Sequence, residues 1–213
     1  MRYPHEKTSF FGLDPTSEES FVPIDSSMHK PLTVERVLNK KLRWMTLGGQ
    51  YDWTAKVYPD GQPPPFPEDM QTLLSNIFPD TTPEAAIVNL YSPGDTLSLH
   101  RDVAETSEKG LISISIGCDA LFVLGMDSTG EDADGACRKV VLRLHSGDVV
   151  YMAGEARFAW HGVPMIVPNT CPLGLQNWPA GDCAVRDSDG NAYERWRSWL
   201  TTKRININVR QVE

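Results

Sequence analysis

Short runs of alternating apolar and polar residues fill most of the chain after residue 83, and turn-forming residues separate them. Runs of this kind, bounded by Gly, Pro, Asp and Ser, are typical of β-strands. We expect strands over Ala85–Tyr91, Thr96–Asp102, Leu111–Gly117, Ala120–Met126, Arg138–Leu144, Val149–Gly154 and Lys203–Val212. Several short strands at this spacing predict an antiparallel sandwich or barrel.

Helical patterns are fewer than strand patterns. Pro67–Phe78 carries apolar residues three and four positions apart, which predicts an amphipathic helix. A second helix is predicted over Ala192–Thr202, with Trp196 and Trp199 packing inward from positions three apart. Residues 1–31 are polar, rich in turn signals and weakly periodic, so we expect an arm or a partner-facing extension. The patterns together predict an α+β fold with a β-rich core.

One face of the last predicted strand is entirely polar. Alternate residues of a strand point to opposite sides, so this face carries Arg204, Asn206, Asn208 and Arg210. An amphipathic strand at the protein surface would show the same pattern. Two further strands carry polar pairs on one face, Asn89 with Tyr91 and His100 with Asp102. The three faces together are consistent with a polar cavity inside the sheet structure.

His100 and Asp102 form an H-x-D pair, which would place both side chains on the same side of a strand. Burying both is costly unless a charge lies between them. A metal supplies such a charge, but a single H-x-D pair also arises by chance and needs a third ligand. The remaining histidines are His5, His29, His145 and His161. Two His and one Asp make the facial triad of non-haem Fe(II) sites, although a zinc hydrolase uses the same residue types.

The inward-facing arginines help to choose between these metals. A dicarboxylate co-substrate such as 2-oxoglutarate chelates iron through its keto-acid end and needs a buried cation for its distal carboxylate. Arg204 suits this role, because a guanidinium grips a carboxylate with two hydrogen bonds and stays charged when buried. A zinc hydrolase has no need for two inward arginines, so the pattern favours an iron oxygenase.

The charge of the chain argues mildly against binding to nucleic acid by bulk electrostatics. The 213 residues carry a formal net charge of −8, with 40% hydrophobic and 23% charged residues, as expected of one globular domain. Basic residues nevertheless concentrate locally at 39–43, 195–199 and 201–204. For Lys40, Lys41 and Arg43, phosphate contact and an ordinary solvated face are equally consistent with the sequence.

Targeting signals and cysteine frameworks are not evident in the sequence. The chain contains no apolar run long enough to span a bilayer, and its start lacks the features of a secretory or organellar signal. The four cysteines are scattered, so free thiols are expected rather than a disulfide or zinc framework: Cys118, Cys137, Cys171 and Cys183. We expect an intracellular protein, in the nucleus, the cytoplasm or the mitochondrion.

Three ordered motifs resemble the AlkB family of Fe(II)- and 2-oxoglutarate-dependent dioxygenases. They are NLYSPGDTLSLHRD at 89–102, HGV at 161–163 and RININVR at 204–210. These correspond to the family's N-x-Y, H-x-D, distal His and R-x-N-x-x-x-R elements, in the same order. The resemblance extends from about Leu42 to Val212, and the stretches YDWTAKVYP and ERWRSWLTTKR look most like the eukaryotic AlkB homologue 1-like subgroup.

The resemblance implies a double-stranded β-helix, or jelly-roll, core with an N-terminal lid and flanking helices. We expect a nucleotide-recognition lid with helices at 35–83 and a catalytic core at 84–213, preceded by the N-terminal arm at 1–34, which does not match the family core, all within one oxygenase domain. The implied cofactors are Fe(II), 2-oxoglutarate and O2. The implied catalytic residues, which are also the iron ligands, are His100, Asp102 and His161.

Roles for other residues also follow from the resemblance. Arg204 would bind the distal carboxylate of 2-oxoglutarate, and Arg210 would lie beside its iron-proximal end. Hydrogen bonds to the co-substrate would come from Asn89, Tyr91 and Asn206. Trp53 and Tyr58 in the lid are candidate stacking surfaces for a base. The other tryptophans are expected to be packing residues: Trp44, Trp178, Trp196 and Trp199.

The reaction implied is oxidative demethylation of N-methylated bases in DNA or RNA, including tRNA, as in DNA repair or RNA modification. The methyl group would leave as formaldehyde while 2-oxoglutarate becomes succinate and CO2. A base inside a duplex would have to be flipped out or already unpaired. We expect a monomer whose partner is methylated nucleic acid and not a membrane. An oxygenase of protein side chains, an abasic-site DNA lyase and a nucleic-acid-binding module remain as alternatives.

Overall fold

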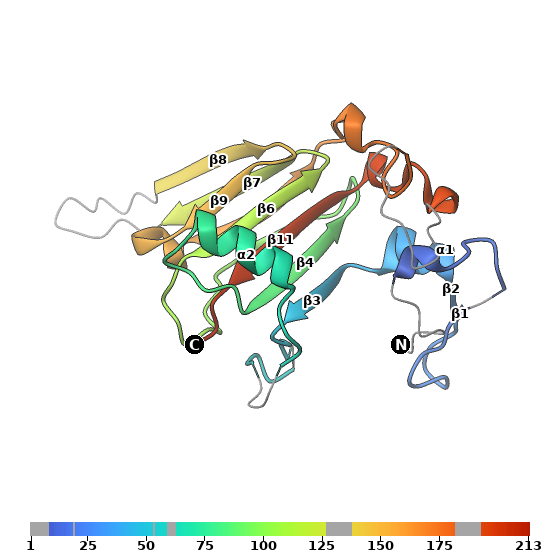
Figure 1. The fold of residues 1–213 in the computed structure, drawn as a ribbon, viewed down its shortest axis with the longest axis horizontal. Helices are drawn as coiled ribbons and strands as arrows, with labels where there is room; N and C mark the ends of the chain where they lie inside the picture. The colour runs from blue at the N-terminus through green and yellow to red at the C-terminus, as the bar shows by residue number, and fades with distance from the viewer. Residues whose placement is uncertain (1–8, 19, 53, 59–62, 127–137, 182–192) are drawn as a thin grey trace.

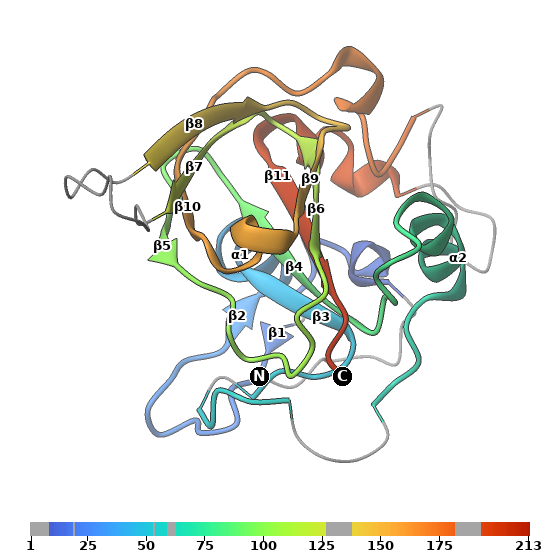
Figure 2. The same cartoon turned by 90° about the vertical axis from the view of Figure 1, so that its left-hand side faces the viewer.

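Two β-sheets form the core of the computed structural model and enclose its interior between them (Figures 1 and 2). The structure describes residues 9–18, 20–52, 54–58, 63–126, 138–181 and 193–213. The larger sheet has the spatial order β3 (Trp44–Gly48), β4 (Ala85–Tyr91), β11 (Arg204–Arg210), β6 (Leu111–Gly117), β9 (Val149–Met152). The smaller sheet has the order β5 (Leu97–His100), β10 (Trp160–Ile166), β7 (Ala120–Met126), β8 (Arg138–Leu144).

The chain passes back and forth between these sheets. From β4 to β11, successive strands change sheet at every step except between β7 and β8, and the paired strands are antiparallel. This connectivity is that of a double-stranded β-helix, and the predicted jelly-roll core is confirmed. The seven predicted strands are all present. β3 and β10 were not predicted as strands.

Helix α2 (Glu68–Ile77) crosses the outer face of the larger sheet (Figure 1). Its Leu74 is buried against Ala86, Ile112 and Val209, each from a different strand. The apolar spacing in this segment therefore predicted both the helix and its buried face. The other helical segments are a few residues long: η1 (Phe10–Gly12), α1 (Val34–Arg36), η2 (Val37–Lys41), η3 (Gly154–Phe158), η4 (Leu173–Leu175), η5 (Glu194–Trp196) and η6 (Trp199–Thr202).

The prediction of one helix over Ala192–Thr202 is wrong. Residues 193–202 form two short turns, η5 and η6, because Arg197 is extended and Ser198 adopts a left-handed conformation with φ of 68°. The two indoles also have different partners: Trp196 donates to the carbonyl of Leu13 and Trp199 to that of Leu38. Both indoles are buried, so their expected packing role is confirmed even though the helix is not.

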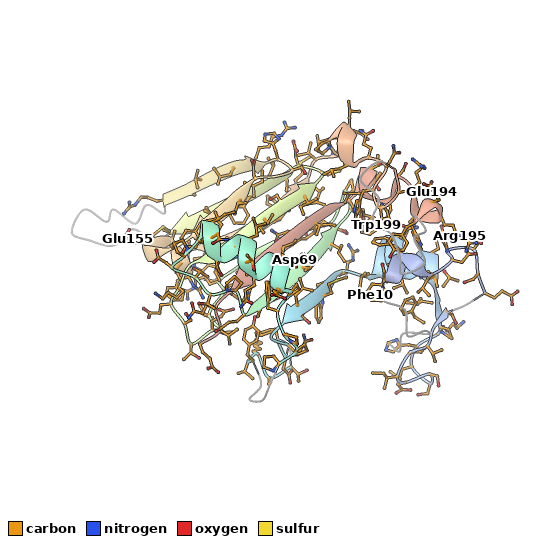
Figure 3. The ribbon with its side chains drawn as sticks, viewed as in Figure 1. Phe10, Asp69, Glu155, Glu194, Arg195 and Trp199 are labelled. Carbon is orange, nitrogen blue, oxygen red and sulfur yellow. The ribbon has the colours of Figure 1, made fainter. Side chains whose placement is uncertain are left out.

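The described part of the predicted arm packs against these indoles. Leu13 and Phe21 are buried in the same core cluster as Trp196 and Trp199, and Figure 3 shows Phe10 on the same side of the molecule as Trp199. A two-stranded sheet, β1 (Ser20–Phe21) with β2 (Leu32–Thr33), completes this region. The domain boundary at residue 34 stays a prediction.

The structure also bears on the expectations for Trp44, the cysteines and membrane-spanning helices. Trp44, expected to pack in the core, is 43% exposed because it lies on β3, at the edge of the larger sheet. Cys118 and Cys171 are buried free thiols, whereas Cys137 and Cys183 lie outside the described residues. No helix in the described part of the chain has the length and apolar character needed to cross a bilayer.

Candidate active site

The two histidines of the site lie opposite each other on neighbouring strands. His100 ends β5 and pairs in register with His161 on β10, and their ring centroids are 4.3 Å apart. Gly162 permits this close approach of the strands, since a Cβ there would lie 2.9 Å from the carbonyl oxygen of Leu97. Sheet pairing therefore holds both imidazoles on the interior side of the smaller sheet.

Each imidazole is oriented by a backbone carbonyl. Nδ1 of His100 lies 2.9 Å from the carbonyl oxygen of Ser98, and Nδ1 of His161 lies 3.0 Å from that of Ala159. When Nδ1 donates its proton to the carbonyl, the lone pair of Nε2 is available to a metal. Burial lowers the pKa of His161, which favours the neutral imidazole that a metal requires.

Asp102 completes the cluster from just beyond the end of β5. The expectation that His100 and Asp102 share one strand is wrong, because the strand ends at His100. The carboxylate still converges on the histidines, with its oxygens 3.7 Å from Nε2 of His100 and 3.9 Å from Nε2 of His161. Within the described chain these residues offer three ligand atoms that all lie within 4.8 Å of one another.

The charge of Asp102 is stabilised by polar side chains from β11. Arg210 donates to its Oδ2 at 3.2 Å and Asn208 donates to the same oxygen at 3.1 Å. Burial alone would raise the pKa of Asp102, but the cation of Arg210 and the other neighbours outweigh it and the pKa is lowered. The carboxylate is therefore ionised and fixed in position before any metal binds.

The three ligand residues face a cavity of about 620 Å³ between the two sheets. Its polar wall comes from β11, which lines the cavity with Arg204, Asn206, Asn208 and Arg210. Val209 and Ile207 point the opposite way, into the cluster beneath α2. The polar face of the last strand therefore lies inside the protein, and the alternative of a polar strand facing water is wrong.

Arg204 lies in this wall with hydrogen-bonding capacity to spare. Its side chain is buried, with 1% of the residue exposed, and Nη2 donates to Oγ of Ser115 at 3.0 Å. Nε and Nη1 of Arg204 have no partner among the described residues, and neither has the buried hydroxyl of Tyr91. Burial raises the pKa of Tyr91 to about 12, so that hydroxyl remains a proton donor. Buried donors without a partner favour the binding of an anionic acceptor beside Arg204.

The asparagines predicted to contact the co-substrate lie beside Arg204. Asn206 on β11 pairs in register with Asn89 on the neighbouring strand β4, and both residues line the cavity. The amide of Asn206 donates to Oγ of Ser113 at 2.8 Å and to the carbonyl of Ile114 at 3.1 Å. These two bonds fix the orientation of the amide group toward the larger sheet.

The residues present fit both Fe(II) and 2-oxoglutarate. Two imidazoles and one carboxylate form the donor set of a non-haem iron site. The guanidinium of Arg204 has N–H groups on Nε and Nη1 without a partner among the described residues, and a carboxylate can accept from them. A metal centre and an anion site thus share one cavity, as an oxygenase with a dicarboxylate co-substrate requires.

Comparison with known proteins decides the family. The model of the 2OG-Fe(II) oxygenase superfamily matches residues 13–210. The chain belongs to this superfamily. Its cofactors are accordingly Fe(II), 2-oxoglutarate and O2.

Curated relatives place the oxygenase in the AlkB family, among its ALKBH1-like members. It is 50% identical over 213 residues to the "N6-methyladenosine RNA demethylase ALKBH" of Cryphonectria parasitica, covering 97% of this chain and 92% of that protein. It is 46% identical over 191 residues to the "tRNA demethylase abh1" of Schizosaccharomyces pombe, covering 86% of this chain but only 57% of that protein. The solved structure of OsALKBH1 matches with a TM-score of 0.57 and 26% identity, over 79% of this chain and 77% of that one.

Two residues that the sequence did not reveal support the metal cluster of the oxygenase. The Glu105 side chain is fully buried and accepts from Arg210 at 2.8 Å and from Arg157 at 3.1 Å. Arg157 also donates to the backbone carbonyl of Asp102 at 2.8 Å. A buried chain of alternating charges therefore runs from Arg157 through Glu105 and Arg210 to the carboxylate of Asp102. No periodicity signals it, because Glu105 and Arg157 belong to segments that meet only in the fold.

The two predicted base-stacking residues have different outcomes. Trp53 lies outside the described residues. Tyr58 does not line the catalytic cavity, but its ring packs edge-on against Tyr51, which does, at a centroid distance of 5.3 Å. Burial raises the pKa of Tyr58 to about 12. Lys56 also lines the cavity, so this part of the predicted lid lies at the site, and base stacking by Tyr58 stays a prediction.

Proposed function

We propose that this oxygenase oxidatively demethylates N-methylated bases in DNA or RNA, releasing formaldehyde, succinate and CO2. The observation that carries the proposal is a single cavity lined both by the His100–Asp102–His161 cluster and by Arg204, whose buried Nε and Nη1 have no partner in the described chain. The names of the relatives, an RNA demethylase and a tRNA demethylase, support nucleic acid as the substrate.

Each part of the cavity has a distinct task in this proposal. His100, Asp102 and His161 hold the iron, which when bound supplies the O2 activation that is coupled to decarboxylation of 2-oxoglutarate. Arg204 binds the distal carboxylate of the co-substrate through guanidinium N–H groups that have no partner in the described chain, and the hydroxyl of Tyr91 donates beside it. Glu105, Arg157 and Arg210 are positioning residues, because they fix the carboxylate of Asp102 without being ligands themselves.

The substrate base enters from the side of the cavity that Tyr51, Lys56 and Arg101 line. Arg101 is exposed, and its guanidinium lies 5.0 Å from the ring centroid of Trp160, which is also exposed. This pair offers a flat cationic surface to the nucleotides that flank a flipped base. We also infer that the oxygenase acts as a monomer, because one chain supplies the whole metal cluster and the anion site.

Nucleoside mass spectrometry on treated bulk tRNA, mRNA and DNA tests the proposal. The iron-loaded oxygenase with 2-oxoglutarate should lower the content of at least one N-methylated nucleoside and release formaldehyde in equal amount. Reactions without 2-oxoglutarate, or with Asp102→Ala, serve as controls and should change nothing. Succinate formation that basic peptides stimulate, and methylated oligonucleotides do not, would instead identify an oxygenase of protein side chains.

A further inference from the structure

A second cavity, of about 810 Å³, lies beside the catalytic cavity, and the two share no lining residue in the described chain. Neighbouring residues face different cavities at two points. Asp95 and Lys203 line the second cavity, whereas Thr96 and Arg204 line the catalytic one. We call the second cavity the basic groove, after its five lining cations: Lys40, Arg43, Arg195, Arg197 and Lys203.

The basic groove gathers positive charge from an acidic protein. It draws on all three local concentrations of basic residues, of which 39–43 is distant in the sequence from the adjacent stretches 195–199 and 201–204. Among the described residues, five Lys and Arg side chains line it but only two acidic ones, Glu35 and Asp95. A cleft lined by one sign of charge focuses the field on a ligand of the opposite sign.

The three guanidiniums of the groove have acidic neighbours but stay largely exposed to solvent. In the described part of the chain they form three ion pairs: Arg43 with Asp95, Arg195 with Asp14, and Arg197 with Glu194. The three arginine side chains remain 53%, 68% and 45% exposed, and water screens ion pairs at such positions. A guanidinium also has five N–H donors, so it can bind a phosphate without leaving its carboxylate. Lys40 is exposed and has no acidic partner in the part of the chain that the structure describes.

Lys203 places a cation at the buried floor of the groove. The residue is only 8% exposed, and Nζ donates to the carbonyl of Asn39 at 2.5 Å and to Oγ of Ser92 at 2.6 Å. Both acceptors are neutral, so neither hydrogen bond offsets the charge of the ammonium, and Asp95 is the acidic group that acts on it. Burial lowers the pKa of Lys203, and the cations of Arg43 and Lys40 lower it further against the opposing effect of Asp95. An anion in the groove would relieve this repulsion.

We propose that the basic groove binds the sugar–phosphate backbone of the nucleic-acid substrate, away from the target base. The inference rests on the proposed function and adds a second contact region to it. Five cations along one groove suit a run of phosphates better than a single phosphate. Contacts to phosphates fix the position of a nucleic acid without reading its sequence. The groove would therefore contribute affinity and orientation, while the catalytic cavity selects the methylated base.

Strand β11 sets the distance between the two contact regions. Lys203 directly precedes β11 at the groove, and Arg210 at the other end contacts Asp102. A strand rises about 3.3 Å per residue, so the floor of the groove and the metal cluster lie roughly 20 Å apart. This is the length of about six base pairs of duplex at 3.4 Å per pair. A base-paired stem next to the target base is long enough to reach from the metal cluster to the groove, whereas a single nucleoside is not.

A matched pair of double variants tests the groove. Lys40→Ala with Arg197→Ala removes two exposed groove cations, and Lys41→Ala with Lys139→Ala removes the same charge elsewhere. Lys41 lines a different cavity and Lys139 lies on β8, so the control reports the loss of net charge alone. Binding to a labelled, unmethylated RNA hairpin with a stem longer than about six base pairs is measured by fluorescence anisotropy over a range of salt concentrations.

The groove variant should bind the hairpin about ten-fold more weakly than the control, with a salt slope shallower by about two. Its KM for a methylated hairpin should rise by a similar factor, while turnover of a methylated trinucleotide and the melting temperature stay unchanged. Equal affinity of the groove and control variants would overturn the inference. Turnover of no methylated nucleic acid by the wild type would instead refute the proposed function, and the anisotropy measurement would still decide whether the groove binds RNA.

Discussion

Replacing Arg204 by methionine should stabilise the free protein and abolish its response to 2-oxoglutarate. In the free protein Arg204 is a buried cation with two unpaired N–H groups, each of which costs about 1–3 kcal/mol. Methionine removes that cost but also loses the bond to Ser115, worth about 1 kcal/mol. The net gain in the free energy of unfolding is therefore about 1–5 kcal/mol. In a chain of 213 residues this raises the melting temperature by about 2–4 °C per kcal/mol.

The response to the co-substrate should change in the opposite direction. At a 2-oxoglutarate concentration of about 100 times Kd, the wild type gains about 2.7 kcal/mol of stability, and Arg204→Met should gain none. Differential scanning fluorimetry under anaerobic conditions, with Fe(II) and with or without 2-oxoglutarate, measures both effects. Arg36→Met, at an exposed position away from the cavity, is the control and should behave as the wild type. The reasoning is refuted if Arg204→Met melts below the wild type when free, or if 2-oxoglutarate still raises its melting temperature.

Three further perturbations probe the metal cluster and the buried phenols. Asp102→Ala should lose Fe(II) binding and succinate formation together, and normal succinate formation after iron is resupplied would contradict its role as a ligand. Glu105→Gln breaks a buried ion network, so the free energy of unfolding measured in urea should fall by about 3–5 kcal/mol. Chelators should also remove iron from this variant more readily. Glu108→Gln, at an exposed position, is the control. Equal stability and equal iron retention in the two variants would disprove the role of Glu105 in positioning Asp102. The pKa values of Tyr58 and Tyr91 are raised to about 12, so the folded state binds more protons than the unfolded state above pH 10. Stability should therefore be intact below about pH 10 and decline toward about pH 12, with both phenols ionising late in an ultraviolet titration; early ionisation of all the tyrosines would contradict this.

Alternation along the chain predicted most of the core, because in a strand it reports directly which face is buried. It failed where that rule does not apply. β10 contains Gly162 and Pro164 and does not alternate regularly, and β3 lies in a stretch that resembled a lid. The helix expected at 192–202 is interrupted because Ser198 adopts a left-handed conformation, which the local residue pattern does not signal.

The candidate site was predictable only in part. The ligand cluster and Arg204 were accessible because they lie in short ordered motifs on or beside strands. The side chains of Glu105 and Arg157 gave no such signal, since their ion pair forms only when two irregular segments pack together. The basic groove was likewise invisible as a unit, although each of its three basic segments was visible. Convergence of distant segments is a property of tertiary packing, which a linear pattern does not contain.

The central position of β11 also restricts how this protein can change during evolution. Its pairing with β4 and β6 runs without interruption from Arg204 to Val209. Inserting or deleting one codon within the strand would exchange its two faces beyond that point, carrying Ile and Val side chains into the cavity and the polar ones beneath α2. A single substitution weakens one contact, whereas such a frame-preserving length change removes several at once. Among descendants of this gene, length differences should therefore accumulate in the connections between strands, while the length of β11 stays fixed.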